Sequence, residues 1–394
     1  MPGTRKIHHL LIAGALILTA CTESPRKFHD RAYVADTHND VLLRVMRGED
    51  IAVRTSSGHS DVPRLEEGGV DMQVFSVWVD PATYGSGSSF QRANEMIDSL
   101  VSLAERIPQR LEIARSYDDL ERLEREGKLA AVIGVEGGHA IENSLEKLKV
   151  LHQRGMRYLT VTWNNSLDWA SSAKDETKGD MGPFAGLNKF GREVIRSCND
   201  LGVMVDVSHA GEQTFWDIIG STTRPVIASH SSVYAICPHF RNLKDDQLQA
   251  IKDNGGVVFV NFFPGYLDST FEGRYLQVEK AHQEELDSLA GIYSRDSEDF
   301  WYGRIQILRD DLSTVAPPVD LLIDHIDYIA NLIGVDHVGL GSDFDGVSVL
   351  PRGMEDATRV PLITEKLLQR GYSRRDVRKI LGENFKRVFR ETVG

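Results

Sequence analysis

The hydrophobic residues of this chain form short, nearly continuous apolar runs that are separated by longer amphipathic stretches. Eight runs predict strands, at residues 33–38, 70–79, 129–136, 157–162, 202–208, 225–230, 256–262 and 337–342. Continuous apolar runs are typical of parallel strands that are covered on both faces. The stretches between them predict helices, one of which ends at Gly202. Eight strand–helix repeats predict an α/β fold, the (β/α)8 TIM-like barrel.

Two stretches lie outside this repeat. Residues 81–128, after the second predicted strand, predict a helical insertion that begins in a loop rich in glycine and serine. Residues 264–317, after the seventh strand, predict a larger helical insertion. Loops that follow the strands of a barrel lie on its active-site face. The insertions could therefore cover the site, form a subunit contact in a homodimer, or be surface excursions without a role in the chemistry.

The chain has 394 residues, enough for one large barrel with insertions or for two smaller domains. Hydrophobic residues make up 41% and charged residues 26%, which is typical of an ordinary globular protein. The formal net charge of −13 argues against binding to nucleic acid or to anionic lipid, since either would favour a basic face. There is no CxxC pattern, and we expect Cys198 and Cys237 to be unpaired.

The N-terminus has the features of a targeting segment. Arg5 and Lys6 precede an apolar run, residues 10–20, that is too short to span a bilayer as a permanent helix. Cys21 follows small residues, as in a bacterial lipoprotein signal, and would become the lipidated first residue. An ordinary secretory cleavage beside an incidental cysteine is the alternative. Thr22 after the cysteine favours the outer membrane if the organism is Gram-negative.

These features predict three parts of the chain. Residues 1–20 would be a lipoprotein signal peptide, residues 21–32 a tether, and residues 33–394 the barrel domain with its insertions. The mature protein would be exported and held in the cell envelope by its N-terminal lipid.

Residues able to bind metal or to transfer protons stand where the predicted strands end. They are His38, Asp40, Glu136, His209, His230 and Asp343. Carboxylates and imidazoles are costly inside a fold unless they are paired or coordinate a metal. The carboxyl ends of all strands in a barrel face one common site. The pattern therefore predicts a metal-dependent enzyme.

The types and spacing of these residues would allow a site for two ions. His38 and Asp40 are two residues apart, so both side chains of an extended segment point the same way and can hold one ion. Glu136 can bridge two cations, while His209 and His230 come from neighbouring strands and could hold the second ion. Two ions about 3.5–4 Å apart activate a shared water and polarise a carbonyl oxygen. The mixed ligands suit Zn²⁺ best, with Mn²⁺ or Co²⁺ as alternatives.

A second His-x-Asp pair, His59 and Asp61, lies on no strand end. Asp61 precedes Pro63 and a helical pattern, so we interpret it as a helix cap and reject it as a ligand. Asp343 and Asp345 both follow the eighth strand. We favour Asp343 as the residue that accepts a proton from the attacking water, because it is nearer the strand end. Arg241 could bind a substrate carboxylate through its planar guanidinium group.

The segments around these residues resemble the membrane dipeptidase (renal dipeptidase) family, zinc metallopeptidases of the barrel amidohydrolase type. In chain order they are "DTHND", "GVEGGHAI", "RGMRYLTVT", "GVMVDVSH", "PVIASHSSVYAICPHFRN" and "VGLGSDFDGV". The resemblance implies two zinc ions, with the first on His38 and Asp40 and the second on His209 and His230. It implies that Glu136 bridges both ions and takes part in catalysis.

The resemblance also implies the parts of the substrate site. Arg241 would bind the substrate carboxylate, Asp343 would shuttle the proton, and Tyr266 would lie near the substrate. Many family members carry a histidine at the position of Trp163, where it contacts the substrate and helps to stabilise the oxyanion. An indole N–H donates one hydrogen bond but cannot become a cation. We therefore expect an intact metal site and an altered substrate preference, with Asn164 or Asn165 as a substitute donor.

The expected function is hydrolysis of dipeptides by a metal-bridging hydroxide, with tolerance of a D-residue on the C-terminal side. One alternative is an amidohydrolase that acts on N-acyl amino acids or lactams, which also supply a carbonyl and often a carboxylate. Another is a peptide-binding lipoprotein without catalysis. The five ligand positions and Asp343 argue against a non-catalytic peptide-binding protein, because binding a peptide needs no residue that shuttles a proton.

Overall fold

The computed structural model describes residues 23–179, 185–295 and 297–394. Eight parallel strands close into a barrel in the order β1 (Ala35–Asp36), β2 (Met72–Trp78), β4 (Leu129–Glu136), β5 (Met156–Thr160), β6 (Met204–Asp206), β7 (Ile227–Ala228), β8 (Val257–Val260) and β9 (Val338–Leu340). The ring closes where Asp36 of β1 pairs with Leu340 of β9. The eight predicted strands and the (β/α)8 barrel are confirmed.

Both faces of the strands are buried, as the continuous apolar runs require. Along β2, Val74 packs with the residues inside the barrel, whereas Phe75 packs on the surrounding helices. The inner layer also contains Phe385 and Phe389 of α18 (Asn384–Thr392), which pack with the side chains inside the barrel. The barrel is therefore a filled core, and its polar residues lie at the strand ends.

Gly134 makes room inside the barrel for the ring of Tyr158. A Cβ on Gly134 would lie only 2.2 Å from that ring, and the pairing of β4 with β5 shifts register between Ile133 and Gly134. Tyr158 is fully buried and reaches toward β1, where its hydroxyl group donates a hydrogen bond to the carbonyl of Thr37. A glycine within a strand thus makes it possible for a tyrosine to reach across the barrel to β1.

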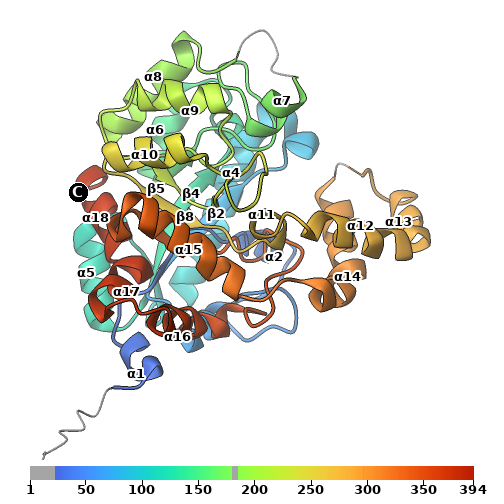
Figure 1. Ribbon diagram of the computed structural model, residues 1–394. Helices are drawn as coiled ribbons and strands as arrows, with labels where there is room; N and C mark the ends of the chain where they lie inside the picture. The colour runs from blue at the N-terminus through green and yellow to red at the C-terminus, as the bar shows by residue number, and fades with distance from the viewer. Residues whose placement is uncertain (1–22, 180–184, 296) are drawn as a thin grey trace, which may run out of the picture.

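Helices surround the barrel (Figure 1). They are α2 (Leu42–Met46), α3 (Val62–Glu67), α4 (Pro81–Arg106), α5 (Tyr117–Glu126), α6 (Leu145–Gln153), α7 (Ala173–Lys178), α8 (Lys189–Leu201), α9 (Glu212–Ile219), α10 (Asp245–Asp253), α15 (Asp320–Ile333), α16 (Pro361–Gln369), α17 (Arg374–Arg378) and α18. Gly202 ends α8 in the left-handed conformation, as predicted.

The insertion after β2 differs in two details from the sequence prediction. The stretch rich in glycine and serine, expected to be a loop, is the first part of α4, because Asp80 caps the helix and Pro81 starts it. The insertion also contains a strand, β3 (Leu111–Ile113), which pairs with the first residues of β4. Three residues are too few to give a periodic signal, so the sequence did not reveal this strand.

The insertion after β8 is helical, as expected. It consists of α11 (Pro264–Leu267), α12 (Phe271–Ala281), α13 (Gln283–Ala290) and α14 (Glu298–Val315). In Figure 1 the last three form a lobe beside the barrel. This lobe has its own small core, which includes Phe271, Leu308 and Leu312.

The N-terminal part of the described chain packs on the barrel. Helix α1 (Pro25–His29) lies against α16 and buries Phe28 and His29, so the folded part begins before residue 33. The predicted signal peptide and Cys21 lie outside the described residues. Among the described helices, none combines the length and the apolar character needed to cross a bilayer. Cys198 and Cys237 are buried and unpaired, as predicted.

Candidate metal centre and active site

The six residues predicted at strand ends meet at one end of the barrel. His38 and Asp40 follow β1, Glu136 ends β4, and the other three follow β6, β7 and β9: His209, His230 and Asp343. All six are at least nine-tenths buried. Because the barrel is closed, strands far apart in the sequence bring these groups to the same point.

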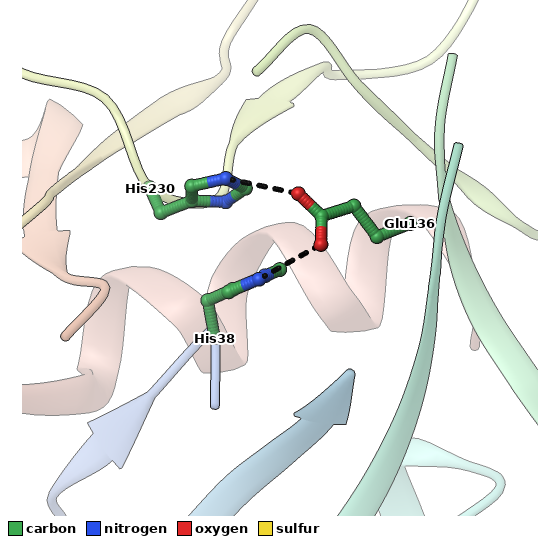
Figure 2. A group of neighbouring side chains, drawn as sticks. All are labelled: His38, Glu136 and His230. Atoms are coloured by element: carbon green, nitrogen blue, oxygen red, sulfur yellow. Dashed lines mark ion pairs between the residues drawn. The ribbon is translucent and has the colours of Figure 1, made fainter. Parts of the chain in front are cut away.

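Glu136 is at the centre of this cluster. One of its oxygens, Oε2, lies 3.4 Å from His38 Nε2, and Oε1 lies 3.4 Å from His230 Nε2 (Figure 2). His209 Nε2 lies 3.0 Å from the same Oε1, and His38 Nε2 lies 3.4 Å from Asp40 Oδ2. Glu136 Oε2 therefore faces His38, and Oε1 faces His209 and His230. This arrangement fits a carboxylate that bridges two cations.

The protein fixes the ring orientation of each of these imidazoles through Nδ1. The Nδ1–H of His38 donates to the hydroxyl oxygen of Tyr158 over 2.8 Å, because that hydroxyl group itself donates to Thr37. In the same way, the Nδ1–H of His230 donates to Ser229 Oγ, which donates to Asp206. Such contacts leave Nε2 unprotonated and turned to the centre, as metal-ligating histidines require.

His209 is oriented by Asn164, from the loop after β5. The Nδ1–H of His209 donates to Asn164 Oδ1 over 3.0 Å. The sequence suggested Asn164 or Asn165 as a donor to the substrate, but this contact engages the side-chain oxygen of Asn164 with a histidine. Asn164 thus lies beside the metal centre as a partner of His209, while the side chain of Asn165 makes a long contact with the Ser166 carbonyl, over 3.5 Å.

The donor set fits a pair of divalent cations. His38 Nε2 and Asp40 Oδ1 are buried and have no hydrogen-bond partner among the described residues. In two groups of three residues, each residue offers one ligand atom and the three atoms lie within 4.8 Å of one another: His38, Glu136 and His230 form one group, and His38, Asp40 and Asp343 the other. Buried carboxylates at this density need positive charge to offset their desolvation.

The pKa values in the cluster show the same need for a cation. Burial opposes a charge on His38, but Tyr158, Glu136 and Asp40 outweigh it and hold the pKa of His38 well above its ordinary value. His209 is different, because burial and the charge of Arg241 lower its pKa to about 3. The carboxylates around His38 thus favour positive charge at this point, which a metal ion bound there would supply.

Asp343 faces the centre from the loop after β9. Its backbone has a φ of 60°, a conformation that side chains other than glycine rarely adopt, and His209 shares this feature with a φ of 64°. Asn261 Nδ2 donates to Asp343 Oδ2 over 2.8 Å. Burial, together with the charges of Asp40 and Glu136, raises the pKa of Asp343 to about 7 against the opposing charge of His38. Such a carboxylate can both accept and return a proton near neutral pH.

Asp345 is turned away from the metal centre. Its carboxylate accepts hydrogen bonds from the His59 backbone N–H over 2.7 Å and from Ser60 Oγ over 2.6 Å, and it faces Arg44. The preference for Asp343 over Asp345 agrees with this geometry. Both aspartates follow the same strand, and only the path of the loop separates their directions.

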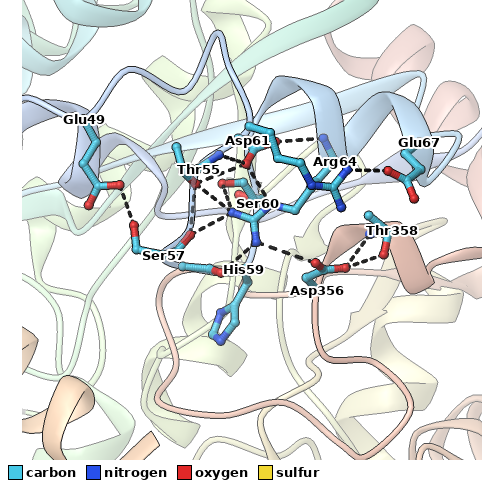
Figure 3. Close-up of polar contacts among 12 residues, drawn as sticks. Glu49, Thr55, Ser57, His59, Ser60, Asp61, Arg64, Glu67, Asp356 and Thr358 are labelled. Carbon is cyan, nitrogen blue, oxygen red and sulfur yellow. Dashed lines mark hydrogen bonds and ion pairs between the residues drawn. The ribbon is translucent and has the colours of Figure 1, made fainter.

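The second His-x-Asp pair belongs to a structural network, as predicted. Asp61 caps α3 by accepting from the backbone N–H of Arg64 over 2.8 Å, and it forms an ion pair with Arg64 Nε over 2.8 Å (Figure 3). His59 Nδ1 accepts from the backbone N–H of Asp345. The pair therefore stabilises the loop beside the site, and neither residue faces the metal centre.

Arg241 and Tyr266 lie together on the β7–β8 side of the site. Arg241 is buried, and its Nη2 donates to the His230 carbonyl over 3.1 Å, while its Nε has no partner among the described residues. The guanidinium carbon lies 5.4 Å from the centre of the Tyr266 ring. A buried cation with an unused donor is suited to bind a carboxylate.

A cavity of about 520 Å³ opens above the metal centre. Its lining includes Asp40, Glu136, His209, His230, Asp343 and Tyr266, with Trp301 and Arg304 from α14. Trp163 also lines the cavity and packs on Trp78, with ring centres 5.0 Å apart. The cavity has the size of a small-molecule site, and the insertion after β8 forms one of its walls.

The sequence did not identify several residues that support the site: Tyr158, Asp206, Ser229 and Asn261. Asp206 accepts hydrogen bonds from Thr160, Ser208 and Ser229, so it fixes three consecutive strand ends. A signal was present, because Asp206 and Asn261 are polar residues inside apolar runs that predict buried strands. Such residues are buried only where they have polar partners.

The whole of the described barrel matches one known family. The family model described as "Membrane dipeptidase (Peptidase family M19)" covers residues 23–393. The chain belongs to the membrane dipeptidase family. The chain is therefore a metal-dependent hydrolase of dipeptides. The residues at the strand ends predicted the metal dependence, and the family resemblance implied the dipeptide substrate.

Solved structures of similar proteins share its fold. The dipeptidase AC, a metallopeptidase of family M19, is 26% identical, with 92% of this chain and 99% of that chain covered and a TM-score of 0.74. The probable dipeptidase PvdM from Pseudomonas aeruginosa is 24% identical, with 93% and 97% covered and a TM-score of 0.77. A metallopeptidase from Rhodobacter sphaeroides, solved with a phosphinate mimic of L-Ala-D-Ala, is 24% identical, with 92% and 99% covered and a TM-score of 0.73.

Proposed function

We propose that this membrane dipeptidase uses two zinc ions, with His38 and Asp40 on the first, His209 and His230 on the second, and Glu136 between them. The observation that carries the proposal is the position of Glu136, whose two oxygens face different imidazoles at 3.0–3.4 Å. Mn²⁺ or Co²⁺ would fit the same mixed nitrogen and oxygen donors.

The chain's own residues divide the reaction between them. When bound, the ions supply Lewis acidity, which polarises the scissile carbonyl and lowers the pKa of water. Asp343 accepts a proton as water attacks the carbonyl carbon, and it returns that proton to the leaving amine nitrogen as the C–N bond breaks. Asn261 holds the Asp343 carboxylate in place for both transfers.

Substrate selection begins at the C-terminus of the dipeptide. Arg241 binds the substrate carboxylate through its unused Nε–H, and Tyr266 packs against its guanidinium group. The related R. sphaeroides metallopeptidase, solved with a mimic of L-Ala-D-Ala, supports tolerance of a D-residue on this side. L,L and L,D dipeptides compared at equal concentration test this point.

A substrate panel tests the proposal as a whole. The protein is stripped with a chelator, reloaded with Zn²⁺, Mn²⁺ or Co²⁺, and assayed against dipeptides, N-acyl amino acids and a lactam. We expect about two zinc ions per chain by elemental analysis and a clear preference for dipeptides. Faster hydrolysis of the N-acyl amino acids than of the dipeptides would overturn the dipeptidase assignment. A single metal ion per chain would overturn the bridging role of Glu136.

The exported, lipid-anchored state of the mature protein is also a proposal. It rests on the sequence around Cys21, which lies outside the described residues. Membrane fractionation of wild type and Cys21→Ser tests it, because loss of the lipid would move the protein to the soluble fraction. The homodimer stays a prediction, which sedimentation of the chain without its first 22 residues tests.

A further inference from the structure

Two tryptophans form one wall of the cavity. Trp78 ends β2, Trp163 follows β5, and their rings lie 5.0 Å apart at 59°. The strand between them in the barrel is β4, which carries Glu136. Trp163 also lies beside the metal centre, with its ring 6.4 Å from that of His209. The pair is therefore close enough to contact a substrate whose carbonyl is held at Glu136.

The part of this wall that Trp78 forms is apolar. The Nε1 atom of Trp78 is fully buried and has no hydrogen-bond partner among the described residues, so its accessible surface is hydrocarbon. The apolar part of the cavity lining also includes Leu43 of α2 and Trp301 and Ile305 of α14, while Asp80 and Lys174 are among its charged residues. The apolar groups would remove an apolar side chain from water without offering it a specific polar contact.

The barrel places this wall opposite the residue that binds the carboxylate. Around the ring, β2, β4 and β5 are the second, third and fourth strands, whereas β7 and β8 are the sixth and seventh. Arg241 follows β7 and Tyr266 follows β8. A dipeptide whose C-terminal carboxylate lies at Arg241 and whose scissile carbonyl lies at Glu136 therefore directs its N-terminal residue toward Trp78 and Trp163.

We propose that the Trp78–Trp163 pair selects dipeptides whose N-terminal residue has a large apolar or aromatic side chain. The inference rests on the proposed binding of the carboxylate by Arg241. Contact with the two rings buries apolar surface in proportion to the size of that side chain. The N-terminal ammonium group gains from the same rings, but every dipeptide carries it, so it cancels in a comparison between substrates.

Two substrate series test the proposal on the zinc-loaded protein. In the first, the N-terminal residue varies as Gly-Ala, Leu-Ala and Phe-Ala; in the second, the C-terminal residue varies as Ala-Gly, Ala-Leu and Ala-Phe. We expect kcat/KM for Phe-Ala to exceed that for Gly-Ala by about 10-fold or more, since a hydrophobic pocket discriminates by this order. Trp163→Ala and Trp78→Ala should each reduce this ratio to near unity, and Trp163→Phe should retain most of it.

Controls separate recognition from folding. Trp216→Phe changes a tryptophan on α9 that does not line the cavity, and it should leave the ratio unchanged. Melting temperatures identify any variant that fails to fold. For folded variants, quenching of tryptophan fluorescence by phosphinate mimics of Phe-Ala and Gly-Ala measures binding without turnover.

Three outcomes would overturn the inference in distinguishable ways. A Phe-Ala to Gly-Ala ratio within about twofold in wild type, or one that Trp163→Ala and Trp78→Ala leave unchanged, would show that the pair is not selective. A change confined to the second series would assign the wall to the C-terminal residue. Hydrolysis of no member of either series would instead overturn the dipeptidase proposal on which the inference rests.

Discussion

Asn261 donates a hydrogen bond from Nδ2 to Asp343 Oδ2 over 2.8 Å, and both side chains are buried at the metal centre. The Asn261 side chain is itself fixed, because its Oδ1 accepts from the backbone N–H of Phe263 over 2.6 Å. Asp343 adopts a backbone conformation that costs energy, with a φ of 60°. Asn261 is therefore a positioning residue for the carboxylate that carries the proton.

Replacing Asn261 by leucine tests this role. Asn261→Leu keeps a similar volume but removes the hydrogen bond, so we expect kcat to fall by about 10- to 100-fold while KM changes little. Asn199→Leu is the matched control. Asn199 lies near the end of α8, is also buried, and is not part of the cavity lining; its Oδ1 accepts a hydrogen bond from the backbone N–H of Thr223. Equal losses of kcat in the two variants would mean that Asn261 acts only through stability.

Tyr158 should influence the metal affinity of His38 through the hydrogen bond to Nδ1. Tyr158→Phe removes the hydroxyl group that accepts the Nδ1–H of His38, so the ring can rotate or change tautomer. We expect metal affinity to fall by about 10- to 100-fold, measured by competition with a chromophoric chelator. Tyr33→Phe is the control, because the hydroxyl group of Tyr33 is buried without a partner among the described residues. An unchanged affinity in Tyr158→Phe would contradict the role given to this contact.

Asp343 should make the stability of the metal-free protein depend on pH. Burial raises its pKa from 3.8 to about 7 in the folded state, so the folded protein binds the extra proton between these values. The free energy of unfolding therefore falls as pH rises through this window, by at most about 4 kcal/mol. Denaturant unfolding of the chelator-treated protein measures it, and Asp343→Asn should have a smaller slope. The hypothesis fails if both proteins show the same dependence.

Metal binding should release the same proton. Cations at Asp40 and Glu136 favour the carboxylate form of Asp343, so loading at pH 6 lowers its pKa and frees a proton. Calorimetric titration in buffers of different ionisation enthalpy counts the protons released. We expect the wild-type protein to release about one more proton per chain on metal binding than Asp343→Asn does. Identical counts would place the proton elsewhere in the cluster.

Arg241 should act on substrate binding through its planar geometry. Arg241→Lys keeps the charge but loses the fixed donors, so we expect KM for dipeptides to rise by about 10-fold or more with a smaller effect on kcat. Arg304→Lys is the control, because Arg304 lines the cavity above the metal centre but is paired with Glu279 at 2.6 Å. The wild-type protein should hydrolyse dipeptides poorly when their C-terminal carboxylate is replaced by an amide. Efficient hydrolysis of these amides would exclude Arg241 as the site that binds the carboxylate.

The sequence alone determined the barrel and the ends of its strands. Continuous apolar runs are a local property, and they located β4 at residues 129–136 without error and all seven other strands within a few residues. Because parallel strands in a barrel share one active-site end, His38, Glu136 and His209 could be placed together before any distance was known. The cap of α3 at Asp61 could also be predicted from local sequence, because it depends on Asp61 and the few residues that follow it.

The tertiary structure decided which atoms meet. The path of one loop turns Asp343 to the metal centre and Asp345 to Arg44, although both follow the same strand. Closure of the barrel brings Tyr158 to His38, Asn261 to Asp343 and Trp78 to Trp163, pairs that lie far apart in the sequence. Periodicity records only which face of an element is buried. The partner across the barrel depends on strand order, register and loop path, which are properties of the whole fold.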